Sequence, residues 1–211
     1  MLSRLRVATN AEAMRVYSYV IDHDLGFAPN PFHGVCTLAA CKPKVRQYAQ
    51  QGDYVVGTGS RPNGCLGQVV YWMRIDEIID FDRYWADPRF RRKRPVMRGS
   101  LVLRYGDNVY HRDPRTGCFV QEDSFHSEPA GRVSAPNLRR DTGTTDRVLL
   151  GREFAYWGGG GPAVPANFAE FVHRTQGHKC CFPPHRAGAF VAWLTEQPDR
   201  GCVGDPTNWT L

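Results

Sequence analysis

The sequence lacks any long run of apolar residues. In its 211 residues no window approaches the roughly 18 consecutive apolar residues that a membrane-spanning helix needs. The first ten residues carry Arg4 and Arg6 but no apolar stretch typical of a signal peptide. We therefore expect a cytoplasmic protein with no membrane partner.

Glycine and proline are too few for a disordered or fibrous chain. The 21 glycines and 15 prolines indicate many loops, and the 42% hydrophobic and 23% charged residues are typical of globular proteins. No internal repeat and no change of composition marks a linker. The composition excludes collagen and coiled coils and predicts a single domain over residues 1–211.

The sequence also lacks a disulfide pattern and a triphosphate-binding loop. Seven cysteines is an odd number, and without an export signal we expect reduced thiols. The glycine-rich segment 57–64 (GTGSRPNG) has neither the spacing nor the lysine of a P-loop, so a nucleoside triphosphatase is not expected. These glycines either turn a hairpin or let a base or phosphate approach the backbone between Gly57 and Ser60.

The excess positive charge is confined to one short segment. Residues 1–88 carry 9 basic and 9 acidic groups and residues 99–211 carry 12 of each, so the net charge of +6 lies in residues 89–98. This basic run is either a solvated loop or a strip that contacts nucleic-acid phosphates, with Phe90 as a stacking face. Its candidate phosphate-binding residues are Arg89, Arg91, Arg92, Lys93, Arg94 and Arg98.

The pattern of apolar and turn residues predicts a mixed α+β fold. Strands are expected at residues 14–21, 53–58, 66–79, 101–104, 118–121 and 147–150, with the second and third forming a hairpin. Helical segments are expected at residues 43–51, 81–85, 164–174 and 187–197.

Three polar clusters follow the short strands, at residues 105–113, 121–127 and 137–142. Their carboxylates and imidazoles suit proton transfer, and their amides suit recognition of a base edge. The candidate residues are Asp107, Asn108, His111, Asp123 and His126. We expect at least three of these five to line one pocket beside the turn at residues 57–60. If they face solvent on different sides, they are ordinary loop residues, and a non-catalytic reader of a modified base becomes the better interpretation.

Two cysteines in the segment 35–42 (VCTLAACK) are candidate nucleophiles. Buried cysteines usually serve as small core residues. A neighbouring cation, however, lowers the pKa of a thiol, and Lys42 follows Cys41 directly. We therefore retain both Cys36 and Cys41 as candidates.

A second group of soft ligands lies close to the C-terminal helix. His178, Cys180, Cys181 and His185 have zinc-binding side chains but no C-x-x-C spacing. We therefore predict no metal or other cofactor, with zinc at these four residues as the alternative.

Long and unusual motifs show a family resemblance. They are YSYVIDHDLGFAPNPFHGVCTLAACKPKVR (17–46), GDYVVGTGS (52–60), YWADPRF (84–90), YGDNVYHRD (105–113) and EDSFHS (122–127). Over residues 15–185 the chain resembles the bacterial and phage family called nucleotide modification associated domain, second type. The resemblance implies a place in gene clusters that make or tailor modified bases in DNA, with other proteins of such a cluster as partners.

Residues 50–95 are also similar to the PUA-like folds of the EVE, ASCH and YTH relatives, which are small barrels that hold one base in a cleft. This resemblance implies an α+β fold with a small PUA-like β-barrel core, flanking helices and long loops. The candidate base-binding residues are Gly57, Ser60, Trp72, Trp85 and Asn108.

These observations favour an enzyme that tailors an unusual base, such as a 7-deazaguanine or a hydroxymethylpyrimidine, in DNA or in its nucleotide precursor. The step would be a hydrolysis or a group transfer. Its candidate catalytic residues are Cys36, Cys41, Asp107, His111, Asp123 and His126. The alternatives are a non-catalytic reader that grips a modified base in DNA, and a scaffold or regulatory subunit.

Overall fold

The fold is that of a computed structural model, which describes residues 14–209. Residues 1–10, in which we expect no signal peptide, lie outside the described residues. The strands are β1 (Val16–Ile21), β2 (Cys36–Leu38), β3 (Tyr54–Gly59), β4 (Val69–Arg74), β5 (Glu77–Asp80), β6 (Tyr110–Arg112), β7 (Phe119–Gln121), β8 (Arg147–Gly151), β9 (Phe154–Tyr156) and β10 (Gly201–Cys202). The α-helices are α1 (Pro43–Tyr48), α2 (Phe81–Ala86), α3 (Leu101–Arg104), α4 (Ala135–Thr142) and α5 (Pro184–Glu196). Shorter 3₁₀ helices cover Pro88–Lys93, Pro129–Gly131, Gly158–Gly160 and Ala166–Phe171.

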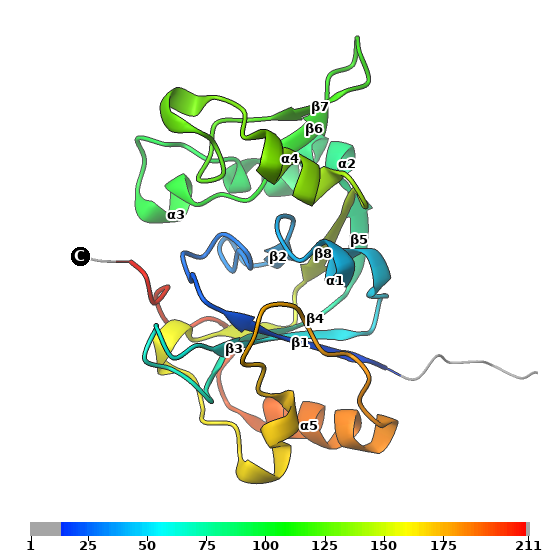
Figure 1. Cartoon of the computed structure of the whole chain (residues 1–211), viewed down its shortest axis with the longest axis vertical. Coiled ribbons are helices and arrows are strands. Elements are labelled where there is room, and N and C mark those ends of the chain that lie inside the picture. Colours follow the sequence, from blue (N-terminus) through cyan, green and yellow to red (C-terminus); the bar gives the residue numbers. More distant parts are fainter. Residues whose placement is uncertain (1–13, 210–211) are drawn as a thin grey trace, which may run out of the picture.

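The largest sheet has the strand order β1-β3-β4-β9-β10 and lies directly above α5 in Figure 1. Strand β1 runs parallel to β3, whereas β4 is antiparallel to both of its neighbours. Alternate residues of β1 enter different cores, as the two-residue repeat of a strand requires. Val16 joins the core shared with α5, while Tyr17 and Tyr19 join the core on the opposite face.

A second sheet, with the order β2-β8-β5, packs against that opposite face. Its other side packs against α2 and the β6–β7 hairpin, where Phe81, Tyr84 and Tyr110 are fully buried. Figure 1 shows the resulting stack, with α5 at one end and the hairpin and α4 at the other.

The predicted α+β class is confirmed, but the barrel is not. Within residues 14–209 the strands form three separate sheets, and none of them closes on itself. The predicted strand at residues 66–79 is two strands, β4 and β5, in different sheets. The chain changes sheets between Ile75, which donates to Asp53, and Asp76, which donates to Leu150.

Most of the predicted elements are present, and one is of the wrong type. The strand expected at residues 101–104 is the short helix α3, because this segment has no strand partner and buries none of its residues. The β3–β4 hairpin, α1, α2 and α5 lie where the pattern predicts them. Asp80 caps the N-terminus of α2, since its carboxylate accepts the Arg83 N–H at 2.7 Å. Within residues 14–209 no helix combines the length and the apolar character that crossing a membrane requires.

A buried polar network holds the second sheet to the outer layer. The carboxylate of Asp107 accepts hydrogen bonds from the hydroxyls of Thr37 and Tyr84, both at 2.6 Å. The ammonium of Lys93 donates to the side chain and the backbone oxygen of Asn30. Burial raises the pKa of Asp107 and lowers the pKa of Lys93 to about 8. Asp107 and Lys93 are costly to bury in their charged forms, and their hydrogen-bond partners offset that cost. Loss of one partner should therefore destabilise the fold.

Replacing Asp107 with alanine is expected to lower the free energy of unfolding by about 3 kcal/mol, because two buried hydroxyls lose their acceptor and Lys93 loses a nearby anion. Urea unfolding of the purified protein measures this difference. A loss below about 1 kcal/mol would show that the network is not a structural anchor.

Candidate functional site

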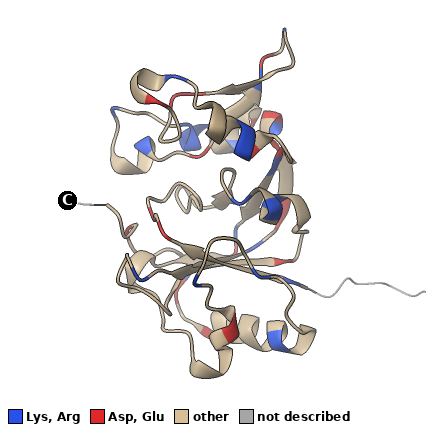
Figure 2. Ribbon diagram, viewed as in Figure 1, with Lys and Arg blue, Asp and Glu red and all other residues tan. Residues whose placement is uncertain are grey.

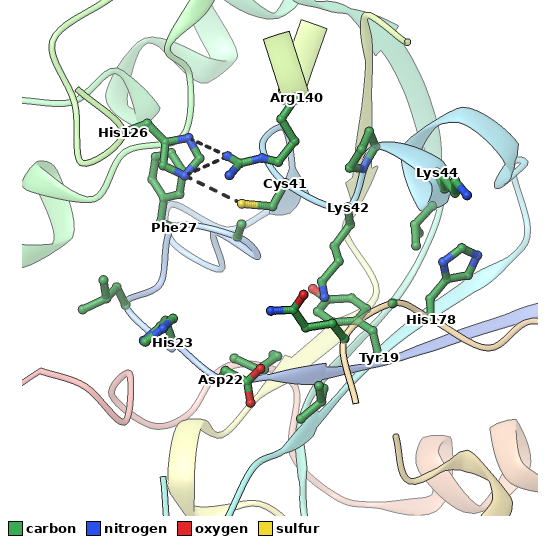
Figure 3. A pocket seen from close by; sticks show the side chains of 18 of the residues that line it. Tyr19, Asp22, His23, Phe27, Cys41, Lys42, Lys44, His126, Arg140 and His178 are labelled. Atoms are coloured by element: carbon green, nitrogen blue, oxygen red, sulfur yellow. Dashed lines mark hydrogen bonds between the residues drawn. The ribbon is translucent and has the colours of Figure 1, made fainter. Parts of the chain in front are cut away.

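A cavity of about 690 Å³ opens beside the end of β1, and Figure 3 shows it from close by. One wall comes from β1 and the loop that follows it, residues 19–28, and another from the turn between β2 and α1, residues 41–45. The loop after β7, helix α4 and the loop at residues 176–178 complete the lining. Segments far apart in the sequence therefore meet at one concave surface, which is the usual arrangement of a small-molecule site.

A cysteine, a histidine and an aspartate contact one another in succession at the edge of this cavity. Sγ of Cys41 lies 3.7 Å from Nε2 of His126, a contact drawn in Figure 3. On the other side of the ring, Nδ1 of His126 lies 3.1 Å from Oδ2 of Asp141. This order of groups is the one in which an imidazole, oriented by a carboxylate, accepts the proton of a nucleophile.

Asp141 is fully buried and contacts both Cys41 and His126. Its Oδ1 accepts the backbone N–H of Cys41 at 2.8 Å, and its Oδ2 accepts the hydroxyl of Tyr110 at 2.9 Å. Both oxygens also bind the guanidinium of Arg140 at 2.9 Å. A carboxylate only accepts, so the proton of a neutral His126 belongs on Nδ1, and the lone pair of Nε2 faces both the Cys41 thiol and an NH₂ group of Arg140, which lies 3.3 Å away.

The charged state of Asp141 follows from these contacts. Burial by itself would raise the pKa of this carboxyl, but the hydrogen bonds from His126 and Arg140 hold it well below its ordinary value. Asp141 is therefore an anion at neutral pH, and it is available to stabilise an imidazolium at His126.

The thiol of Cys41 is protonated at rest. Burial first, and then the negative charge of Asp141, raise its pKa to about 11, and they outweigh the opposing effect of Lys42 and two arginines. The expectation that Lys42 lowers this pKa enough to give a thiolate is therefore wrong. An attack by Cys41 would need a base within reach, and Nε2 of His126 lies 3.7 Å from its sulfur.

The turn that carries Cys41 has an unusual backbone. Cys41 and Lys42 both adopt left-handed conformations, with φ of 57° and 42°, immediately before Pro43 begins α1. Non-glycine residues in this region cost about 1 kcal/mol or more each and persist where the surroundings hold them. The buried Arg46 does this, because it donates to the backbone oxygens of Cys41 and Asp141.

The rest of the cavity wall combines aliphatic residues such as Ile21, Leu25 and Val45 with cationic and aromatic ones. Lys42, Lys44 and Arg140 line it, whereas Asp22 is the one carboxylate among the described lining residues. The aromatic lining residues are Tyr19, Phe27 and Phe125, together with His23, His126 and His178. Such a wall suits a flat ring that carries a negative charge.

The sequence model of the family described as nucleotide modification associated domain 2 matches residues 13–211, nearly the whole chain. The chain belongs to this family. Membership connects the protein with nucleotide or DNA modification. Searches of curated proteins and of solved structures find no match.

Of the polar and thiol candidates, Cys41 and His126 line the cavity of this nucleotide modification associated domain. Cys36 is fully buried in β2, and Asp107 and Asn108 lie within the buried network. His111 stacks on Trp85 at 4.4 Å between ring centroids and contacts Glu122, while Asp123 is exposed. Of the five polar residues expected to share a pocket, the cavity contains His126 alone among the described lining residues.

The candidate base-binding residues are held away from the cavity by packing. Gly57 lies inside β3, where a Cβ would come within 2.5 Å of the Tyr71 ring. Ser60 is buried at the end of that strand, and Trp72 is fully buried in the core against α5. Trp85 packs on the outer layer beneath the guanidinium of Arg94, at 3.7 Å from the ring centroid.

The basic run of this family member is divided between internal and exposed groups. Arg89 forms ion pairs with Glu77 and Asp87. The buried Lys93 donates a hydrogen bond to the backbone oxygen of Asn30, and Arg94 donates one to the backbone oxygen of Trp85. Phe90 is buried and offers no stacking face. Arg91, Arg92 and Arg98 are exposed, and for them phosphate contact stays a prediction. Figure 2 shows that Lys and Arg are otherwise spread over all layers.

The four residues considered for zinc do not gather. Within residues 14–209 no three His, Cys, Asp or Glu side chains are placed to share a metal ion. His178 lines the cavity instead, and its ring lies 6.0 Å from that of Tyr17.

The sequence interpretation missed Asp141 and Arg140 as site residues. Both belong to the polar cluster at residues 137–142, which forms the helix α4. Asp141 follows Leu138 by three residues and shares its inward face, so the helical period was the signal that could have identified it.

The anionic state of Asp141 predicts a specific acid sensitivity. A carboxylate whose pKa is lowered by folding stabilises the protein above the ordinary pKa of about 4, and this contribution is lost as the pH falls below that value. The unfolding free energy of the wild type should therefore fall more steeply than that of Asp141→Asn between about pH 5 and pH 2. Parallel urea titrations measure both slopes, and equal slopes would contradict the assigned charge.

Proposed function

We propose that this protein is an enzyme that modifies a nucleobase through attack by the Cys41 thiol on an electrophilic carbon. The observation that carries the proposal is the line Cys41–His126–Asp141 at the wall of the cavity. Family membership supplies the substrate class, because the family is connected with nucleotide modification. A reader of modified bases has no need for a thiol, a base and an orienting carboxylate in this order.

The chemical step is the addition of a thiol across a polarised double bond of the base or of its substituent. The Cys41 sulfur forms a bond to the carbon while its proton passes to Nε2 of His126. The electron pair of the attacked bond moves to the heteroatom, which then takes the proton back from the imidazolium. Asp141 stabilises the imidazolium between these two transfers. A water molecule then attacks the same carbon while His126 takes its proton, the C–S bond breaks, and the departing sulfur receives that proton, so Cys41 returns as a thiol and the base has gained one water.

The wall of the cavity supports a nucleotide as the occupant. Phe27 and Phe125 lie beside His126, with ring centroids 4.4 Å and 6.0 Å from the imidazole, and they provide an apolar surface for a base near the thiol. The cavity of about 690 Å³ is within the range of about 300–1,000 Å³ found for small-molecule sites.

Incubation with a small-molecule extract tests the proposal. Purified protein is added to nucleotides extracted from native cells that lack the gene, and the nucleotides are followed by liquid chromatography and mass spectrometry. The wild type should consume one nucleotide and form one new product, whereas His126→Ala should leave the extract unchanged. Identical profiles with both proteins, in the extract and in added genomic DNA, would overturn the proposal.

A further inference from the structure

The cavity has two ends of different character. Figure 3 shows His126 and Phe27 on one side, near Cys41, while Lys44 and His178 lie on the other side. The ammonium of Lys42 is directed away from the thiol and lies over the Tyr19 ring, 4.4 Å from its centroid. The thiol end is therefore separate from the lysine end.

The cations at the lysine end have no fixed anionic partner. Within residues 14–209 no hydrogen bond or ion pair is formed by the ammonium of Lys42 or of Lys44. Arg140, in contrast, is committed to Asp141 at the thiol end. Burial lowers the pKa of Lys42, with a smaller opposing effect of Cys41 and of Asp22. The Tyr19 ring offsets part of the desolvation cost of the Lys42 ammonium, and an anionic ligand would offset more of it.

The basic run offers a poorer phosphate site than the cavity does. None of its six cations is among the described residues that line the cavity, and Arg89, Lys93 and Arg94 are tied to Glu77, Asp87, Asn30 or Trp85. The exposed Arg91, Arg92 and Arg98 could therefore hold phosphates only outside the cavity. A base that is flipped out of a duplex leaves its phosphates at the protein surface, and would need exposed cations around the opening. Cations inside the cavity indicate instead that the phosphate enters with the base.

Resting on the proposed function, we infer that the substrate is a free nucleotide whose phosphate binds Lys42, Lys44 and His178 inside the cavity, while its base lies against Phe27 and Cys41. The modified base is accordingly made before its incorporation into DNA. For a nucleoside monophosphate, the reaction that consumes the product is a phosphorylation towards the triphosphate, because polymerases take triphosphates.

Calorimetric titration tests this inference without any need for turnover. The probes are the four common deoxynucleoside monophosphates, the matching nucleosides and a short DNA duplex, each added to the full chain. At least one monophosphate should bind with a Kd of about 1 mM or tighter, and about tenfold or more tighter than its nucleoside. Lys42→Met should remove that advantage and leave nucleoside binding unchanged.

Two further variants make the result decisive. Lys44 is exposed, so Lys44→Met tests the same end of the cavity without disturbing the core. Arg115 lies in the β6–β7 hairpin outside the cavity, with a side chain 88% exposed, and Arg115→Met should bind like the wild type. The inference is overturned if no monophosphate binds, if phosphate gives no advantage over the nucleoside, or if the duplex binds more tightly than every monophosphate.

The outcome is independent of the chemistry at Cys41. Binding of monophosphates with an active Cys41→Ala protein would overturn the proposed thiol attack but keep the nucleotide site. An inactive Cys41→Ala protein that binds only duplex DNA would keep the thiol attack and overturn the free nucleotide.

Discussion

Replacing Cys41 with alanine is expected to reduce turnover of the nucleotide by about 10³-fold or more, with substrate binding and the free energy of unfolding close to those of the wild type. Cys41 is half-buried at the cavity wall, and its thiol contacts His126 at 3.7 Å. Removal of the sulfur takes away the nucleophile and little packing. Turnover is followed by mass spectrometry of the nucleotide, and binding by calorimetry.

Cys36 provides the matched control. It is fully buried in β2 within the core between the two larger sheets, and burial raises the pKa of its thiol far above the ordinary value. Cys36→Ala should therefore cost about 1–2 kcal/mol of stability and leave the turnover of the folded protein unchanged. A folded Cys36→Ala protein without activity, or a fully active Cys41→Ala protein, would refute the assignment.

The second large effect is expected from Asp141→Asn. The amide keeps the size of the side chain but removes the charge, and its NH₂ group replaces one of the two acceptor oxygens. If the NH₂ takes the place of Oδ1, the Cys41 N–H loses its acceptor; if it takes the place of Oδ2, Tyr110 and the Nδ1 proton of His126 lose theirs. In both orientations Arg140 loses one of its two hydrogen bonds and the charge of its partner. Turnover should fall by about 10²–10⁴-fold, and the free energy of unfolding by about 3 kcal/mol.

Asp146→Asn is the comparison for that variant. Asp146 also forms an ion pair with an arginine, Arg112, but its side chain is 39% exposed. Its replacement should cost less than about 1 kcal/mol and should not change turnover. Full activity of Asp141→Asn at a temperature where it remains folded would show that His126 needs no orienting carboxylate.

The fold was predictable where the pattern is local. The β3–β4 hairpin and the helices α1, α2 and α5 follow from alternation, from the capping Asp80 and from an apolar face. The division of residues 66–79 into two strands was not predictable from the local pattern. The change from one sheet to the other after Ile75 depends on hydrogen-bond partners in other parts of the chain.

The site was predictable only in its separate parts. Cys41 and His126 are evident as reactive residue types, but their distance of 85 residues in the sequence hides their contact. Asp141 lies 100 residues after Cys41, and its role depends on how α4 packs against the β2–α1 turn. Residue type also failed to distinguish Asp107 and Lys93, which are buried for stability, from groups that face a cavity.

Nucleoside mass spectrometry of native cells tests the central claim most directly. Cells that lack the gene are supplied with the wild-type gene or with Cys41→Ser, and the nucleosides of their DNA and nucleotide pool are compared. The wild-type gene should restore one modified nucleoside, while Cys41→Ser should leave it absent and let its unmodified precursor accumulate. Restoration of the same nucleoside by Cys41→Ser, at the same level, would contradict a thiol-dependent nucleotide-modifying site.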